Sequence, residues 1–204
     1  MARLLIATNN QGKLAEYEAL LDGCGWEIVS PADVGVDLSV EETGDDYATN
    51  ASIKARAFAS VSGLLTLGDD SGLEVEALDG RPGPLSARYA GPNQTDEEGV
   101  ELVLAEMKEV PAEQREARFR CVIALAEPES ELRIVEGECR GLITSSPRGS
   151  NGFGYDPIFY LPELGKTMAE LTFDEKNAIS HRAHAGKKAC DLLKEMAGEG
   201  TGDA

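Results

Sequence analysis

The sequence holds few of the residues from which metal fingers are built, and it lacks long apolar runs. Its only histidines are His181 and His184. Its cysteines lie far apart and form no CxxC pair: Cys24, Cys121, Cys139 and Cys190. A zinc finger is therefore excluded. No apolar run approaches the roughly 20 residues of a membrane span, and the first run ends at Thr8, too early for a signal peptide. We therefore expect a cytoplasmic protein with reduced thiols.

Basic residues are also scarce. Lys and Arg number 19 against 37 Asp and Glu, which gives a formal net charge of -18. Because this charge repels nucleic acids and anionic membranes, neither is an expected partner. A small phosphorylated ligand is compatible with it, since a local cluster of Lys and Arg with a divalent cation outweighs the global field at short range. A solvated acidic surface that aids solubility is the commonest cause of such a balance.

The length of 204 residues suits one large α/β domain or two small lobes that share a core. The apolar periodicity predicts strands at 3–7, 26–30, 64–67, 73–78, 118–126 and 132–138. It predicts helices at 14–21 and 46–62, a third between Thr95 and Pro111, and a last one from Ser180. Because strands and helices alternate along the chain, we expect a mixed α/β fold. The segment GEGTGDA at 198–204 is expected to be a flexible tail.

A polar turn, TNNQGK, separates the first predicted strand from the first predicted helix. Backbone N–H groups at a helix start attract anions, Asn side chains donate hydrogen bonds, and Lys13 supplies a compact positive charge. The turn is therefore a candidate phosphate site. An ordinary polar turn with a helix N-cap explains the same six residues.

Two adjacent carboxylates, Asp69 and Asp70, occur in GDDSG at the end of a predicted buried strand. Because successive side chains of a strand point to opposite faces, one of the two can face a cleft. A carboxylate there, together with a Glu such as Glu42, is a usual way to hold Mg²⁺ through oxygen ligands. An Asp-rich turn that ends a strand is the alternative interpretation.

The predicted helix after Glu42 carries a second candidate for anion binding. Asn50 and Lys54 are four residues apart, so they share one face of that helix. Both side chains could therefore point at an anion. The alternative is that Lys54 is an ordinary solvated lysine.

Two later segments offer contacts for a nucleotide. NGFGYDP supplies aromatic faces at Phe153 and Tyr155, which can stack on a purine, and a carboxylate at Asp156. EKNAISHR gathers hydrogen-bond donors next to a helix start: Lys176, His181 and Arg182. A surface helix terminus is the alternative for the last two of these.

Together these segments resemble the inosine triphosphate pyrophosphatase family, the non-canonical purine nucleoside triphosphatases that clean the nucleotide pool. The resemblance covers nearly the whole chain, with the motifs in the family's order: ATNNQGK, EETG, NAxxKA, DDSGLEVEALDGRPGPLSARYAG, NGFGYDPIF and KTMAELTFDEKNAISHR. One departure is Thr49, which stands where the family usually has Glu in an ENA triplet.

The resemblance implies an α/β fold with an elongated mixed sheet flanked by helices. It implies two lobes within a single domain at 1–197, an active-site cleft between the lobes, and a homodimer. The implied reaction is the hydrolysis of ITP, dITP or XTP to the nucleoside monophosphate and pyrophosphate, with Mg²⁺ as the cofactor.

The resemblance also implies roles for residues at matching positions. Asp70 matches the proton acceptor, and Asp70 with Glu42 matches the Mg²⁺ ligands. The phosphates would be bound by Thr8, Asn9, Asn10, Gln11, Gly12 and Lys13, with Lys54 as a further cation. The other implied substrate contacts are Ser71, Phe153, Gly154, Tyr155, Asp156, Lys176, His181 and Arg182. Donors from the last two would suit the 6-keto group of hypoxanthine or xanthine and oppose the amino group of adenine.

Two other functions stay open at this point. One is a nucleotide pyrophosphatase for a pyrimidine or another modified base on the same type of scaffold. The other is a nucleotide-binding protein without turnover, which would be favoured if Thr49 disabled metal binding. The presence of Asp70, Glu42 and Lys13 argues against the second.

Overall fold

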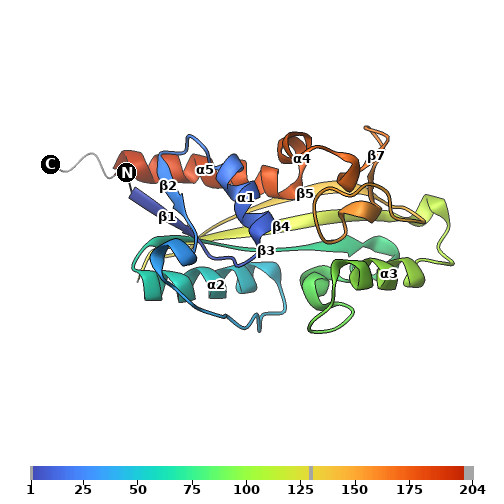
Figure 1. Cartoon of the computed structure of the whole chain (residues 1–204), viewed down its shortest axis with the longest axis horizontal. Helices are drawn as coiled ribbons and strands as arrows, with labels where there is room; N and C mark the ends of the chain where they lie inside the picture. The colour runs from blue at the N-terminus through green and yellow to red at the C-terminus, as the bar shows by residue number, and fades with distance from the viewer. Residues whose placement is uncertain (1, 129–130, 200–204) are drawn as a thin grey trace. The chain divides into compact units, whose positions relative to one another are not determined.

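The structure, a computed structural model, describes residues 2–128 and 131–199 (Figure 1). The strands are β1 (Ala2–Ile6), β2 (Trp26–Val29), β3 (Leu65–Val75), β4 (Glu116–Ala126), β5 (Arg133–Ile143), β6 (Phe159–Leu161) and β7 (Lys166–Thr167). The α-helices are α1 (Gln11–Leu20), α2 (Tyr47–Ser62), α3 (Asp96–Glu106), α4 (Phe173–Ile179) and α5 (His181–Glu199). In this part of the chain the strands form a seven-stranded sheet in the order β2-β1-β3-β4-β5-β6-β7. It is a mixed sheet, because β1 pairs parallel with β2 and β3 whereas β6 pairs antiparallel with β5 and β7. The predicted α/β class is confirmed.

The chain divides into two compact units. Unit 1 takes its described residues from 1–70, 121–137 and 182–204, and unit 2 consists of 71–120 and 138–181. Strands β3, β4 and β5 each contribute residues to both units. The single two-lobed domain expected over 1–197 stays a prediction. Helix α5 continues to Glu199, and the rest of the expected tail, 200–204, lies outside the described residues.

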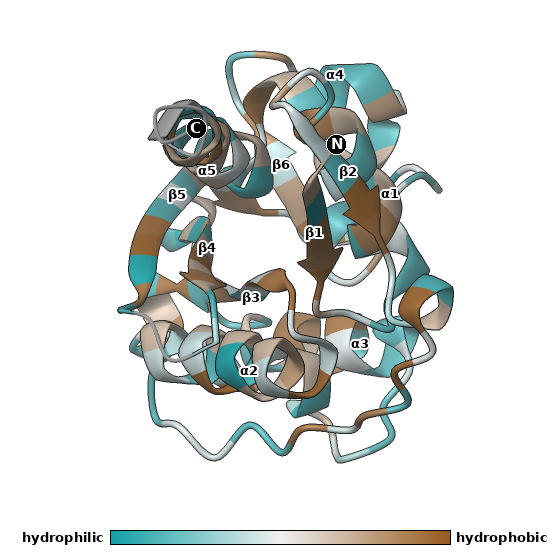
Figure 2. Cartoon of the chain, turned by 90° about the vertical axis from the view of Figure 1, so that its left-hand side faces the viewer, coloured by the Kyte–Doolittle hydropathy of each residue, from teal (hydrophilic) through white to brown (hydrophobic). Residues whose placement is uncertain are grey.

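In unit 1, helices cover both faces of the sheet, because consecutive strand residues point to opposite sides. On β1, Leu4 and Ile6 belong to a buried cluster with residues of α1 and α5, whereas Leu5 packs in a second cluster with Phe58 of α2. Strand β4 alternates between clusters in the same way. Figure 1 shows α2 on one side of these strands and α1 and α5 on the other, and Figure 2 shows mostly hydrophobic strands β1 and β2 between them. Burial on both faces explains the continuous apolar runs of β1 and β4.

Strand β3 corrects one expectation about the site. GDDSG does not end a strand, because β3 runs without interruption from Leu65 to Val75. Gly68 allows this, since a Cβ atom there would lie 2.5 Å from the backbone oxygen of Ala51 on α2. The strand therefore passes close against the helix. Asp69 and Asp70 lie inside the strand and are only 2% and 5% exposed, so both carboxylates need partners in the protein.

The helices begin and end where their capping residues predict. Asp46 accepts a hydrogen bond from the Thr49 N–H at the start of α2, and Gly63 ends that helix with φ +69°. Thr95 and Glu98 form a capping box at the start of α3, the helix predicted after Thr95. Within the described part of the chain, none of the helices combines the length and apolar composition that crossing a membrane requires.

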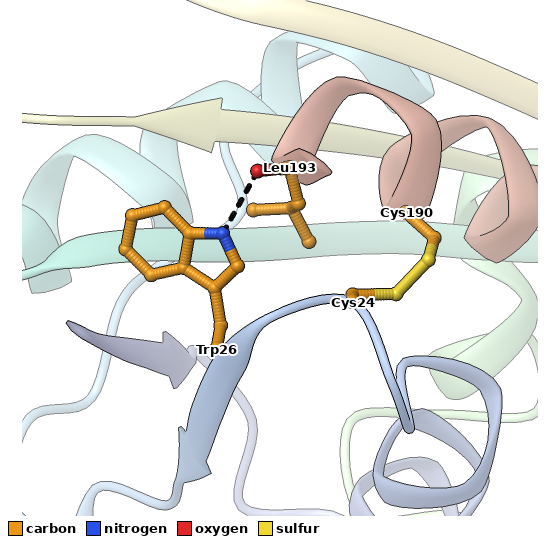
Figure 3. Close-up of a disulfide and its surroundings, with 4 residues drawn as sticks. All are labelled: Cys24, Trp26, Cys190 and Leu193. Carbon is orange, nitrogen blue, oxygen red and sulfur yellow. Dashed lines mark hydrogen bonds between the residues drawn. A yellow bond between two sulfur atoms is a disulfide. The ribbon is translucent and has the colours of Figure 1, made fainter. Parts of the chain in front are cut away.

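The expectation that all cysteines are reduced is wrong for two of them. A disulfide joins Cys24, between α1 and β2, to Cys190 on α5 (Figure 3). Their Cα atoms are 5.4 Å apart, within the usual range for a disulfide, although 166 positions separate them in sequence. The indole N–H of Trp26 donates to the Leu193 oxygen beside it, at 2.9 Å. The disulfide and this hydrogen bond both tie the segment after α1 to α5.

Unit 2 is organised around one buried cluster. Helix α3 contributes Val100 and Val103 to it, and strands β3 to β6 contribute residues such as Phe119 and Phe159. The rings of these two phenylalanines are 4.4 Å apart between centroids. The long loop between β5 and β6 also enters this cluster, through Tyr155. The loop is therefore partly anchored in the core of the unit.

Candidate active site

The TNNQGK segment links β1 to α1 and is held by its own hydrogen bonds. Thr8 Oγ1 accepts from the Asn10 N–H at 3.1 Å, and Asn10 Oδ1 accepts from the Lys13 N–H at 3.0 Å. Asn10 is therefore the N-cap of α1, as the simpler interpretation of the turn predicts. The rest of the segment is exposed or half-buried: Asn9, Gln11 and Gly12. The start of α1 is accordingly open to a ligand from solvent.

Lys13 reaches from α1 to Asp69 on β3. Its Nζ atom lies 2.9 and 3.1 Å from the two carboxylate oxygens. Asp69 faces the α1 and α5 side of the sheet, because it follows Leu67 by two residues and Leu67 packs on that side. Burial raises the pKa of Asp69, but the attraction of Lys13, Arg182 and Lys54 outweighs burial and holds the pKa well below its usual value. Asp69 is therefore a buried partner of Lys13 whose charged form is favoured by its neighbours.

Asp70 faces the opposite side of the sheet, toward α2. Its Oδ2 atom accepts from Asn50 Nδ2 at 3.1 Å, and its Oδ1 atom is 3.9 Å from Lys54 Nζ. Lys54 also bonds Glu42 Oε1 at 2.6 Å, and Asn50 Oδ1 accepts from the Gly44 N–H at 2.8 Å. The Lys54 side chain is only 12% exposed, so it is not an ordinary solvated lysine. Asn50 and Lys54 thus share a face, as expected, and hold the EETG loop next to Asp70.

The electrostatics of Glu42 and Asp70 fit a hard cation. Burial raises the pKa of Asp70 to about 6, and the negative charge of Glu42 acts in the same direction while Lys54 opposes it. A bound cation would relieve this repulsion, and carboxylate oxygens are the ligands that Mg²⁺ prefers. The described residues contain no group of three or more His, Cys, Asp and Glu that could hold a metal ion. Two carboxylates suit Mg²⁺, which usually takes its other ligands from water and substrate phosphate.

Thr49, the departure from the family motif, belongs to the cap of α2. Its N–H and its hydroxyl both donate to Asp46, at 2.8 and 2.9 Å. The side chain is exposed, whereas Asn50 beside it is buried against Asp70. The Glu42 and Asp70 pair is therefore assembled through Asn50 and Lys54 without Thr49.

Arg182 lies at the start of α5 and is 1% exposed. Its Nη1 atom donates to Glu16 Oε2 on α1, and its Nη2 atom is 3.6 Å from Asp69 Oδ2. The surface location considered for Arg182 is therefore wrong. Sequence reasoning did not single out Glu16, although helical spacing places it on the same face of α1 as Lys13 and the buried Tyr17. A carboxylate on the buried face of a helix is the signal that could have found it.

A second cluster of predicted residues lies in unit 2. Lys176 Nζ on α4 donates to Asp156 Oδ2 and sits 4.5 Å from the centroid of the Phe153 ring. The same carboxylate oxygen accepts from the Phe153 N–H at 3.0 Å. Gly152 leaves room for this arrangement, because a Cβ atom there would overlap Asp156. The structure thus brings a half-buried aromatic ring together with a buried ion pair.

Other predicted contacts in unit 2 are turned into its interior. Tyr155 is buried in the core, and its hydroxyl donates to the Ser86 oxygen at 2.9 Å, so its ring is not open for stacking on a base. The His181 ring stacks on Phe119 with centroids 4.7 Å apart and is buried as well, contrary to the surface alternative. The remaining predicted contacts are half-buried: Ser71 and Gly154.

Comparison with known proteins decides which family these features belong to. Residues 4–192 match the sequence profile of the Ham1 family. The chain belongs to the Ham1 family. A dITP/XTP pyrophosphatase of Halalkalibacterium halodurans is 50% identical over 188 residues, which cover 92% of this chain and 97% of that protein. A dITP/XTP pyrophosphatase of Bacillus subtilis is 48% identical over 194 residues, which cover 95% of this chain and 98% of that protein.

Solved structures of Ham1 proteins agree with this assignment. A HAM1 protein from Coxiella burnetii superposes with a TM-score of 0.87 at 44% identity, covering 96% of this chain and 100% of that one. The Ham1 protein of Staphylococcus aureus gives a TM-score of 0.84 at 40% identity, covering 95% of this chain and 99% of that one. The family resemblance inferred from the sequence motifs is therefore confirmed.

Within this Ham1 chain, unit 1 gathers groups suited to phosphate chemistry. It carries four carboxylates in contact with three cations: Glu16, Glu42, Asp69 and Asp70 with Lys13, Lys54 and Arg182. Cations bind phosphate oxygens, a carboxylate pair binds a divalent ion, and a buried carboxylate can accept a proton. Unit 2 separately offers an aromatic ring with an adjacent ammonium group.

Proposed function

We propose that this Ham1 chain hydrolyses non-canonical purine nucleoside triphosphates, namely ITP, dITP and XTP, to the monophosphate and pyrophosphate. One observation carries the proposal: adjacent aspartates of β3 face opposite sides of the sheet, and each contacts its own lysine. Asp69 contacts Lys13 next to the polar turn, and Asp70 contacts Lys54 next to Glu42. The names of the two bacterial relatives, dITP/XTP pyrophosphatases, support the same reaction.

Lys13, Lys54 and Asp70 of unit 1 would each have a defined part in the reaction. Lys13 and the backbone N–H groups at the start of α1 would bind phosphate oxygens. Lys54 would help to stabilise the negative charge that develops on the leaving pyrophosphate. Asp70 would accept the proton of the attacking water, and Asn50 would hold the Asp70 carboxylate in a fixed orientation.

Glu42 and Asp70 would hold the Mg²⁺ ion. When bound, Mg²⁺ would neutralise charge on the phosphate oxygens and orient them for in-line attack. Lys54 contacts both carboxylates and so keeps them close together before substrate arrives. Protein groups alone therefore prearrange the two carboxylates.

Choice of base would depend on hydrogen-bond donors and on stacking. The 6-keto group of hypoxanthine or xanthine accepts hydrogen bonds, whereas the 6-amino group of adenine donates them. The half-buried ring of Phe153 would stack on the base, and Lys176 would fix that ring through its cation–π contact. The contribution of His181 and Arg182 to base choice stays a prediction, because both side chains are buried among protein partners.

A hydrolysis panel tests the proposal. ITP, dITP, XTP, GTP, ATP and dTTP are each incubated with and without Mg²⁺, and the products are separated by chromatography. We expect monophosphate and pyrophosphate from ITP, dITP and XTP, only with Mg²⁺. Preference for a pyrimidine would favour the related pyrophosphatase, and tight binding without products would favour the binding protein. Release of single phosphates would refute the proposed cleavage site.

The oligomeric state and the cellular location of the protein also belong to the proposal. The family resemblance is the reason to propose a homodimer, and the cytoplasmic location expected from the sequence stays a prediction. Light scattering coupled to gel filtration would measure the mass of the particle directly. A mass near 21.7 kDa, that of one chain, would contradict the dimer.

A further inference from the structure

Two buried carboxylates of unit 1, Glu16 and Asp69, have no part in the chemistry proposed above. Both belong to a closed chain of contacts. Lys13 contacts Asp69, Asp69 lies 3.6 Å from Arg182, and Arg182 contacts Glu16. Glu16 is three residues after Lys13 on α1, which closes the chain through the helix. We call these four residues the charge ring.

Positive and negative members alternate around the charge ring, so its formal charge is zero. Glu16, Asp69 and Arg182 are 3%, 2% and 1% exposed, and such buried charges are tolerated only when they are paired. The Lys13 side chain is 17% exposed and is the member that reaches solvent. The ring therefore joins one partly exposed lysine to three buried charged residues.

The contact between Asp69 and Lys13 is specific in its geometry. Both carboxylate oxygens lie within hydrogen-bond distance of one Nζ atom. A lysine side chain has four rotatable bonds and ordinarily samples many positions. A two-point contact with a carboxylate fixed in the middle of β3 removes most of that freedom. The ammonium group is then held beside the start of α1, where the phosphates are expected.

We propose that Asp69 is a positioning residue that acts through Lys13, with Arg182 and Glu16 holding Asp69 in place. This inference rests on the proposed function and deepens it. A purely structural role for Asp69 would be neutralisation of Arg182 in the interior of the unit. The two roles predict different results for kcat/KM. If Asp69 positions Lys13, the loss on changing Asp69 depends on the presence of Lys13. If Asp69 only neutralises Arg182, the loss is the same with and without Lys13.

A double-mutant cycle measures that dependence. Asp69→Asn, Lys13→Ala and the double variant are compared for kcat and KM on ITP with Mg²⁺, and for calorimetric binding of inorganic tripolyphosphate with Mg²⁺. We expect Asp69→Asn to lower kcat/KM by roughly 10- to 100-fold, since misplacement of a binding group by about 1 Å costs up to about 100-fold. In the Lys13→Ala background the same change should cost less than about 3-fold.

Two further variants make the result decisive. Asp69→Glu keeps the charge but moves the carboxylate by one methylene, so it should still fold and should lose kcat/KM and tripolyphosphate affinity. It carries the test if Asp69→Asn does not fold. Asp33→Asn is the matched control: Asp33 is an exposed carboxylate of unit 1 that bonds Ser30, and its replacement should leave kcat/KM unchanged.

The outcomes separate this inference from the proposed function. Equal losses on changing Asp69 with and without Lys13 would overturn the positioning role while leaving the proposed function intact. Full activity and affinity in Asp69→Glu would overturn it as well. A wild-type chain that neither hydrolyses the purine triphosphates nor binds tripolyphosphate would overturn the proposed function and the inference together.

Discussion

Breaking the bond between Cys24 and Cys190 should lower the stability of unit 1 without removing any of the proposed site residues. The bond closes a loop of 166 residues, for which the chain-entropy relation gives about 5 kcal/mol at 25 °C. Measured values usually fall at about 2–4 kcal/mol because native strain and residual structure intervene. For a chain of this size, a loss of about 3 kcal/mol corresponds to a melting temperature lower by roughly 6–12 °C.

The assay combines thiol counting with unfolding. Without reductant, the denatured wild-type chain should expose only the two thiols of Cys121 and Cys139, and with reductant all four. Cys190→Ser should unfold at lower denaturant concentration than the oxidised wild type and at about the same concentration as the reduced wild type. Cys139→Ser is the control in unit 2, and its stability should respond to reductant as the wild type does. Four thiols without reductant, or a stability that reductant leaves unchanged, would refute the reasoning.

Three further predictions follow from buried groups. Asp70→Asn should lower kcat by about 100-fold or more, because the amide cannot accept the proton of the attacking water. The melting temperature should not fall, because the amide keeps the shape of the side chain and removes a buried charge. Full activity would contradict the proton-acceptor role. Burial raises the pKa of both Cys121 and Cys139 to about 11, so these thiols should resist iodoacetamide in native protein at pH 8 and react only as the pH approaches 11. Rapid labelling at pH 8, detected by mass spectrometry, would contradict this. Gly68→Ala should lower the free energy of unfolding in urea by at least about 1–3 kcal/mol, since the new Cβ atom would lie 2.5 Å from a backbone oxygen. Gly186→Ala, whose new Cβ atom would have its nearest contact at 3.4 Å, should leave the free energy of unfolding nearly unchanged.

Features set by neighbouring residues in the chain were predictable from the sequence. The caps of α2 and α3 depend on side chains within a few residues, and these caps occur where expected. The predicted strand 118–126 likewise corresponds to β4, because its apolar run is buried on both faces. GDDSG was predicted to end a strand because Gly and Asp are depleted in strands, and this was wrong. Its place in β3 depends on α2, which packs against Gly68, a contact that no local pattern reveals.

Part of the candidate site was likewise predictable from the sequence, and part of it was not. The polar turn and the pairing of Asp70 with the EETG loop through Asn50 and Lys54 follow recognisable motifs. The contacts of Arg182 with Glu16 and Asp69 follow no recognisable motif. These residues lie on α5, α1 and β3 and meet only after folding. The disulfide was missed for the same reason.

The division of the chain between the two units has a consequence for its synthesis. Unit 1 needs α5, which supplies Arg182 to the charge ring and Ala185, Ala189 and Leu193 to the cluster over β1, β3 and β4. During translation, every other helix and strand leaves the ribosome before α5 does. The nascent chain must therefore wait with one face of its sheet only partly covered, by α1, and with Glu16 and Asp69 lacking their arginine. A chain stalled before α5 would display the uncovered part of this apolar face to chaperones and proteases, so unit 1 can complete its core only after the last helix is released.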